Sequence, residues 1–207
     1  VTADFGRILE VIPATELLIQ WDYCTEVIDV VGADHGGREL EIMQPWISAD
    51  SVEEKFARHT ASEYIGPLAA GIPDEVHYGY HVCLGTFPQF PTTPAADLGW
   101  MVRMTNALVR RTPRRVDFVH LPATAEADRA YFAPLTELDV AGARVFLGIG
   151  HRDGTDAITA RGQAAREFLP DFGISHYCGY GRDDRERITE LLGELRSAAD
   201  LLAVGTD

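Results

Sequence analysis

The chain has 207 residues, of which 46% are hydrophobic, and a formal net charge of -14 at pH 7. A negative charge of this size repels nucleic-acid phosphates and anionic lipid headgroups, so we expect neither nucleic acid nor a membrane as a partner. No apolar run approaches the roughly 20 residues that a membrane-spanning helix needs, and the N-terminus carries no export signal.

Short β-rich segments alternate with amphipathic, helix-like segments along the chain. We predict five strands, at residues 17–23, 77–84, 116–121, 143–151 and 172–178. Helices are predicted from Ser51 toward Gly71 and at residues 95–111, 157–169 and 185–204. This alternation is typical of βα units, so we predict an α/β fold with a parallel sheet, in a single domain over residues 1–207.

A long irregular segment follows each of the first two strands. Residues 33–50 contain two glycines and a proline, and residues 85–94 contain three prolines, a composition that predicts loops. In parallel α/β folds, the loops at the C-terminal ends of the strands carry the functional residues. The candidate site is therefore expected at this end of the sheet.

Side chains that can bind a metal gather at the ends of these strands. Alternate residues of a strand share a face, so one face of each strand can be read from the sequence. In chain order, these faces end in Asp22, His81 with Cys83, His120, His151 and Cys178. If the faces converge, as they do at the top of a closed parallel barrel, these side chains meet in one place.

Two of these strand ends supply a donor set that suits Zn²⁺. Two thiolates with an imidazole favour this ion, and three protein ligands with one open position are typical of a catalytic zinc site. We therefore predict Zn²⁺ as the cofactor, with His81, Cys83 and Cys178 as ligands. A lone His-x-Cys is also compatible with packing, because free cysteine is often buried, and that interpretation stays open.

The other cysteine and several histidines are interpreted as structural. An odd number of cysteines without an export signal predicts free thiols in a reducing cytoplasm. Cys24 lies just past the end of the first strand, so we expect it to be a packing residue. His77 is expected to be a hydrogen-bonded interior histidine, and His35 and His59 to lie in loops or on the surface.

Residues 79–85 (GYHVCLG) and 177–182 (YCGYGR) carry a resemblance to a known family. They resemble the C-terminal catalytic barrel of cobalamin-independent methionine synthase, within the wider group of uroporphyrinogen-decarboxylase-like and methionine-synthase-like barrels. In that family a strand-borne His-x-Cys and a distant Cys-Gly-x-x-x-Arg hold zinc. The resemblance covers most of the chain and implies a (β/α)8 TIM barrel, of which about five C-terminal βα units are present.

The same resemblance implies roles for residues around the metal. The first strand looks like the family's strand that ends in Gln-x-Asp, which implies that Gln20 and Asp22 bind the amino group of the substrate. The glycine-rich end of the fourth strand implies that His151 is catalytic. Two departures stand out: Tyr23-Cys24 replaces the family's Glu-Pro, and His120 replaces its fourth ligand, a glutamate. His120 is therefore expected either to bind the metal or to border the substrate.

These expectations lead to a zinc-dependent transfer of a methyl or alkyl group to a substrate thiol, which is activated as a zinc-bound thiolate. The expected partners are a small-molecule thiol and an alkyl or methyl donor. Asp22 would bind a cationic group of the substrate, and His151 would handle a proton on the leaving group. A zinc-dependent lyase, hydrolase or decarboxylase on the same barrel remains an alternative, as does a degenerate, noncatalytic barrel that binds a small molecule.

The length of the chain gives a last expectation. A complete eight-stranded barrel needs about 250 residues, and five strands alone leave two edges unpaired. We therefore expect the missing strands to come from an upstream segment or from another chain, including a second copy in a homo-oligomer, and Val1 not to be the native start.

Overall fold

The computed structural model describes residues 2–34, 49–85, 95–180 and 183–204. They contain a sheet of five parallel strands in the order β1-β2-β3-β4-β5. The strands are β1 (Leu18–Tyr23), β2 (His77–Val82), β3 (Phe118–Pro122), β4 (Arg144–Gly150) and β5 (Gly173–His176). All five predicted strands and the parallel α/β arrangement are confirmed.

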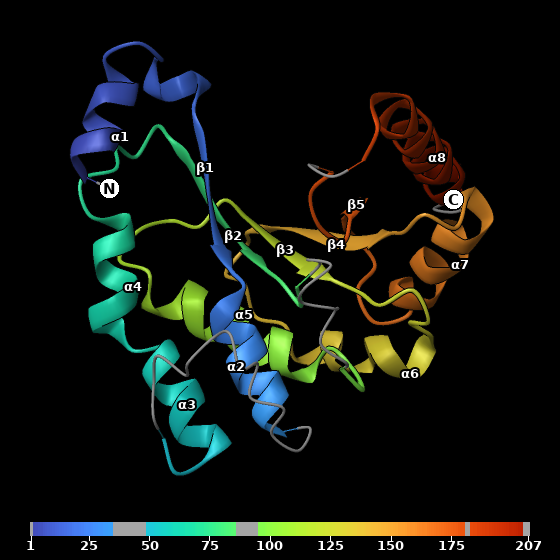
Figure 1. Cartoon of the computed structure of the whole chain (residues 1–207), viewed down its shortest axis with the longest axis horizontal. Coiled ribbons are helices and arrows are strands. Elements are labelled where there is room, and N and C mark those ends of the chain that lie inside the picture. Colours follow the sequence, from blue (N-terminus) through green and yellow to red (C-terminus); the bar gives the residue numbers. More distant parts are fainter. Residues whose placement is uncertain (1, 35–48, 86–94, 181–182, 205–207) are drawn as a thin grey trace.

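Helices connect the strands in the pattern expected of βα units. They are α1 (Thr2–Leu9), α2 (Thr25–Asp34), α3 (Val52–His59), α4 (Ser62–Ala69), α5 (Gly99–Arg111), α6 (Arg129–Phe132), α7 (Thr155–Arg166) and α8 (Arg185–Val204), with short 3-10 turns at Ala14–Glu16 and Ala133–Glu137. In Figure 1, α2, α3, α5 and α6 lie below the sheet, α4 lies to its left, and α7 and α8 lie beside β4 and β5. The predictions for α5, α7 and α8 are confirmed to within a few residues.

The single helix predicted from Ser51 is in fact two helices, α3 and α4. The helix begins as expected, because Ser51 Oγ accepts a hydrogen bond from the Glu54 amide at 3.1 Å. It ends because two carbonyl groups are used elsewhere: Tyr23 donates to the His59 oxygen at 2.9 Å, and Arg111 donates to the Thr60 oxygen. These tertiary hydrogen bonds draw the backbone away from the helical path.

The core lies between the sheet and the helices and determines which way β2 faces. Tyr78, Tyr80 and Val82 are fully buried on the helix side of the strand. The hydroxyl groups of the two tyrosines are hydrogen-bonded in a short chain, since the Tyr78 hydroxyl bonds to that of Tyr80 at 3.0 Å and the Tyr80 hydroxyl bonds to that of Thr112 at 2.7 Å. Because strand side chains alternate, this packing directs the intervening His81 to the opposite, inner face.

The inner face of the sheet is partly open. Leu18, Gln20 and Asp22 of β1 are exposed there, and the two edge strands β1 and β5 each pair with one neighbour. The five parallel strands are consistent with part of a barrel, and no closure of a barrel is seen in the described residues. Across the described ranges, no helix has both the length and the hydropathy needed to span a membrane.

Two predictions for histidines outside the site are wrong. His59, the last residue of α3, is buried, with 6% of its surface exposed. It is held there by a hydrogen bond of 2.8 Å to the carboxylate of Asp29 on α2. His77 is not interior, since its side chain is 60% exposed at the first residue of β2. His35 and most of the predicted loops 33–50 and 85–94 lie outside the described residues.

Candidate metal centre

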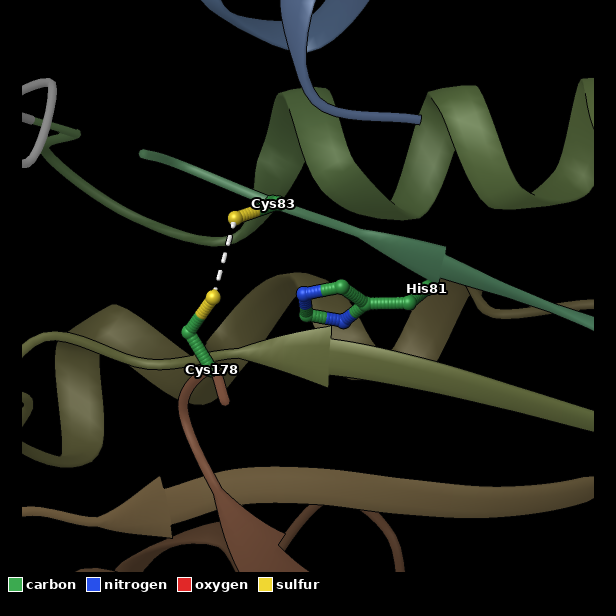
Figure 2. A group of neighbouring side chains, drawn as sticks. All are labelled: His81, Cys83 and Cys178. Atoms are coloured by element: carbon green, nitrogen blue, oxygen red, sulfur yellow. Dashed lines mark hydrogen bonds between the residues drawn. The ribbon is translucent and has the colours of Figure 1, made fainter. Parts of the chain in front are cut away.

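Three of the predicted ligands come together at the C-terminal end of the sheet. The ligand atoms of His81, Cys83 and Cys178 all lie within 4.8 Å of one another, and the two sulfur atoms are 3.8 Å apart. Figure 2 shows Cys83 and Cys178 facing each other, with a ring nitrogen of His81 turned toward the two sulfurs. This compact set of one imidazole and two thiols fits the donor preference of zinc.

The contact requires the sheet to curl. His81 lies on β2 and Cys83 directly follows it, whereas Cys178 lies two residues past the end of β5. Two strands, β3 and β4, separate β2 from β5 in the sheet. Side chains from such distant strands meet only when the sheet bends toward its inner face, as the wall of a barrel does.

His81 provides the clearest sign that the site takes a ligand. Its side chain is buried, with 4% exposed, and neither Nδ1 nor Nε2 has a hydrogen-bond partner within the described part of the chain. A buried imidazole with no partner costs about 1–3 kcal/mol. A metal ion between His81 and the sulfurs would satisfy one of these nitrogens, so the residues present fit a metal centre.

The environment of Cys83 favours the neutral thiol when no cation is present. A hydrogen bond with Cys178 lowers the pKa of the Cys83 thiol, but the contact with Cys24 and burial outweigh it and raise the pKa to about 12. The amide of Gly85 also donates to the Cys83 sulfur at 3.4 Å. Thiolate ligation therefore requires a bound cation that displaces the proton.

Cys24 borders this cluster, which the sequence interpretation missed, although its sulfur is not among the ligand atoms that lie within 4.8 Å of one another. Its thiol makes a hydrogen bond with Cys83, and this bond lowers the pKa of Cys24. The expectation of a residue used only for packing is therefore incomplete. The signal was in the alternation itself, because Cys24 continues the face of Gln20 and Asp22 by one more step.

His120 lies beneath His81, not between the sulfurs. Its Nε2 is hydrogen-bonded to Ser175 Oγ at 2.7 Å, and its ring stacks on that of His81. Burial, reinforced by the neighbouring His81, lowers the pKa of His120 to about 3. A hydrogen bond with the backbone of His176 acts in the opposite direction on this pKa. The predicted role of His120 as a metal ligand stays a prediction.

The predicted substrate-binding pair lies on the exposed inner face of β1. Gln20 Nε2 donates to Asp22 Oδ1 at 2.8 Å, which fixes the carboxylate of Asp22. Asp22 pairs in register with His81 on β2, so the carboxylate lies beside the candidate metal centre. This position is accessible to a cationic group of a small molecule.

His151, the predicted catalytic residue, directly follows β4. Its Nε2 donates to the Ala123 carbonyl at 3.0 Å, and its ring stacks on Tyr177, with ring centres 4.5 Å apart and an angle of 8° between the planes. Burial, together with the charge of Arg161, lowers the pKa of His151 and so favours the neutral imidazole. Tyr177 directly precedes Cys178, so this stacking links His151 to the segment that carries Cys178.

Comparison with known proteins adds one finding about the fold. A solved structure, the B12-independent methionine synthase from Shewanella sp. W3-18-1 in complex with selenomethionine, superposes with a TM-score of 0.59 at 14% sequence identity. The fold is distantly methionine-synthase-like. The match covers 99% of this chain and 53% of that one, so the chain spans about half of the length of the methionine synthase. No protein-family model matches the sequence, and neither does any curated protein.

The methionine-synthase-like fold agrees with the first part of the resemblance seen in the sequence. The His-x-Cys segment lies on β2, and Cys178 reaches it from the end of β5. The segment from Cys178 to Arg182 matches the Cys-Gly-x-x-x-Arg pattern only in outline, being one residue shorter, and its Gly181 and Arg182 lie outside the described residues. At this identity the comparison establishes the fold alone, and the chemistry has to be argued from the side chains.

Proposed function

We propose that the protein transfers a methyl or alkyl group to a substrate thiol and that zinc is its resident metal. The observation that carries the proposal is the buried His81, whose two ring nitrogens lack partners in the described chain and whose ring is turned toward the sulfurs of Cys83 and Cys178. The distant likeness of the fold to a methionine synthase supports a transferase.

His81, Cys83 and Cys178 would hold the zinc ion. When bound, zinc lowers the pKa of a thiol in its coordination sphere, so that the thiol is nucleophilic near neutral pH. The three protein ligands are buried or half-buried, and two of them are thiols that a reducing cytoplasm keeps available.

Two further side chains would handle the substrate. Asp22, held by Gln20, would bind an ammonium group beside the centre. His151 donates from Nε2 to Ala123, which leaves Nδ1 as the ring atom that can take up a proton and pass it to the leaving group. The stacking on Tyr177 restrains the ring in this orientation.

The test begins with metal content. Protein purified without chelator is expected to contain stoichiometric zinc, and the His81→Ala variant to contain none, whereas the exposed His77→Ala variant retains it. A small aminoalkyl selenol is then added, and X-ray absorption at the zinc edge is expected to detect a selenium neighbour. Transfer is assayed with a panel of methyl and alkyl donors and the corresponding thiol. Wild-type protein without stoichiometric zinc would overturn the proposal.

The same measurements separate the alternatives. A lyase, hydrolase or decarboxylase would keep an oxygen neighbour on zinc in the presence of the selenol and would turn over without a thiol acceptor. A noncatalytic barrel would retain its biological activity when Cys83→Ser and Cys178→Ser are combined. Either result would exclude thiol transfer.

A further inference from the structure

The segment that carries Cys178, between β5 and α8, is tied on both sides of the cysteine to one side chain, that of Arg152. Arg152 Nη1 donates to the Tyr177 hydroxyl at 3.1 Å. Its Nε donates to Asp183 Oδ1 at 2.9 Å, and its Nη2 donates to Oδ2 of the same carboxylate. Tyr177 precedes Cys178 and Asp183 follows it, so a single guanidinium holds the chain upstream and downstream of the candidate ligand.

The upstream side is fixed by three contacts of Tyr177. Its amide donates to the Gly150 carbonyl at 3.2 Å, its ring stacks on that of His151, and its hydroxyl accepts the bond from Arg152. Three consecutive residues at the end of β4 therefore hold the backbone, the ring and the hydroxyl of the residue next to Cys178. Little freedom is left to the start of the segment.

The downstream side is fixed by the carboxylate of Asp183. Its side chain is 10% exposed, and its amide donates to the Tyr180 carbonyl at 2.8 Å, which closes a turn just before α8. A guanidinium that binds both oxygens of a carboxylate fixes its plane as well as its position. Arg152 itself is 45% exposed, and an ion pair at the surface adds little to global stability. Its contacts matter most for the local path of the chain.

The place of the Cys178 sulfur matters because a shared metal fixes its distance from the Cys83 sulfur. Two thiolates bound at about 2.3 Å to one tetrahedral zinc ion lie about 3.8 Å apart. The two sulfurs are already 3.8 Å apart. Cys83 directly follows β2, whereas Cys178 lies two residues past the end of β5, so the sheet alone does not place it. Its position depends on what holds the segment around it.

We infer that Arg152 is a positioning residue of the metal centre, which holds the segment on both sides of Cys178 and so sets its sulfur against Cys83 and His81. The inference rests on the proposed function for the identity of the metal and goes beyond it by naming a residue outside the ligand set. The three protein ligands and the open position for a substrate thiol are unchanged. Because the stacked ring of His151 contacts the same tyrosine, one segment places both the metal ligand and the histidine.

Zinc affinity of the full chain, measured in competition with a chromogenic chelator, is the first test. Arg152→Gln is expected to bind zinc about 10- to 100-fold more weakly than the wild type. Arg152→Lys keeps the charge without the planar fork and is expected to lose part of this affinity. Arg129→Gln is the matched control, because Arg129 is also exposed and pairs with Glu167 outside the segment, and it is expected to bind zinc as the wild type does. Circular dichroism checks that the variants are folded.

A trivalent arsenical reports on the two sulfurs without zinc. Phenylarsine oxide joins two neighbouring thiols through two As–S bonds with loss of water, so its affinity for the metal-free protein depends on how Cys83 and Cys178 are placed. Arg152→Gln is expected to weaken this binding by a factor similar to that for zinc, and Arg129→Gln to leave it unchanged. Cys178→Ser, which removes one of the two thiols, verifies that the arsenical binds at this pair.

A double-mutant cycle with Asp183→Asn separates positioning from a general structural effect. Since Arg152 and Asp183 act through the same hydrogen bonds, the double variant is expected to lose no more zinc affinity than Arg152→Gln alone. Fully additive losses would overturn the inference, as would unchanged zinc and arsenical affinities in a folded Arg152→Gln protein. Wild-type protein that binds the arsenical but no zinc would overturn the proposed function, whereas weaker arsenical binding by Arg152→Gln would still support the positioning role.

Discussion

The imidazole rings of His81 and His120 lie face to face, with ring centres 4.4 Å apart and an angle of 21° between the planes. The two residues are partners in the register of β2 and β3, which places both side chains on the inner face. Two protonated imidazoles in this arrangement would repel each other, and burial together with His81 lowers the pKa of His120 to about 3. The stacked pair therefore requires a neutral His120.

This requirement predicts how the stability of the metal-free protein depends on pH. The pKa of His120 is about 3 in the folded protein against the ordinary 6.5, so below pH 6.5 the unfolded chain binds a proton that the folded chain does not. Stability is full above pH 6.5 and falls toward pH 3, with a slope of up to about 1.4 kcal/mol per pH unit from this residue. Urea unfolding of wild type and His120→Gln measures the difference. Equal slopes for the two proteins would contradict the prediction, and the exposed His77→Gln serves as control.

The environment of His81 predicts that its replacement changes stability and metal binding in opposite directions. Since neither of its buried ring nitrogens has a partner in the described chain, His81→Leu is expected to stabilise the metal-free protein by about 1–2 kcal/mol while abolishing zinc binding. His59 is an equally buried control whose ring bonds to Asp29 at 2.8 Å, so His59→Leu is expected to destabilise the protein. Urea unfolding and zinc titration of both variants check the opposite signs. Destabilisation of the metal-free protein by His81→Leu would show that the ring is satisfied in solution.

The close packing around Gly148, where β4 meets β5, leaves no room for a side chain. A Cβ atom there would lie 2.7 Å from His120 Nε2, 2.7 Å from Tyr177 Cα and 3.1 Å from the His176 oxygen. Because two of these atoms belong to the backbone, Gly148→Ala is expected to cost about 1–3 kcal/mol and to displace the segment that carries Cys178. Zinc affinity should fall together with the unfolding free energy.

The control for this substitution is another glycine with free space around it. Gly193 is exposed in the interior of α8, and a Cβ there meets no atom within 4 Å. Gly193→Ala is expected to stabilise the helix by up to about 1 kcal/mol. If both alanine variants shift stability in the same direction, the close approach at Gly148 is not a constraint in solution.

The sequence predicted the sheet better than the parts that depend on tertiary contacts. Alternation and strand length located all five strands and the three side chains that meet at the candidate metal centre, because these features are local. The break between α3 and α4 was missed because it depends on Arg111. This residue is more than fifty residues away from Thr60 in the sequence, and its side chain donates a hydrogen bond to the Thr60 carbonyl. A hydrogen bond from a distant element leaves no local pattern.

Cys24 shows a different limit. Its place on the inner face follows from the same alternation that located Cys83, but the expected end of the strand at residue 23 stopped the pattern one residue early. Strand ends are the least certain part of a pattern, and functional residues of parallel sheets lie there. His59 was misjudged for the opposite reason, since its burial comes from Asp29, a residue of another helix.

The side chain of Arg161 holds together the backbone segments around His151. The side chain is 5% exposed, and it binds the Asp153 carboxylate through two hydrogen bonds of 2.7 and 2.8 Å while also donating to the carbonyls of Ile149 and Ala125 at 2.9 Å. These bonds tie the end of β4 to the loop that follows β3, on either side of His151. Lysine cannot form the planar fork, so Arg161→Lys leaves buried carbonyls and the carboxylate unpaired and is expected to cost about 3 kcal/mol.

The matched substitution for this clamp is Arg7→Lys, because Arg7 forms an exposed ion pair with Asp4 on α1. It is expected to change stability by less than about 0.5 kcal/mol. In Arg161→Lys the loosened strand end should also raise the pKa of His151 toward its ordinary value, since burial and Arg161 both lower it in the wild type. Nuclear magnetic resonance titration of the imidazole measures this change, and an unaltered His151 titration in a destabilised variant would show that Arg161 supports the fold without positioning the histidine.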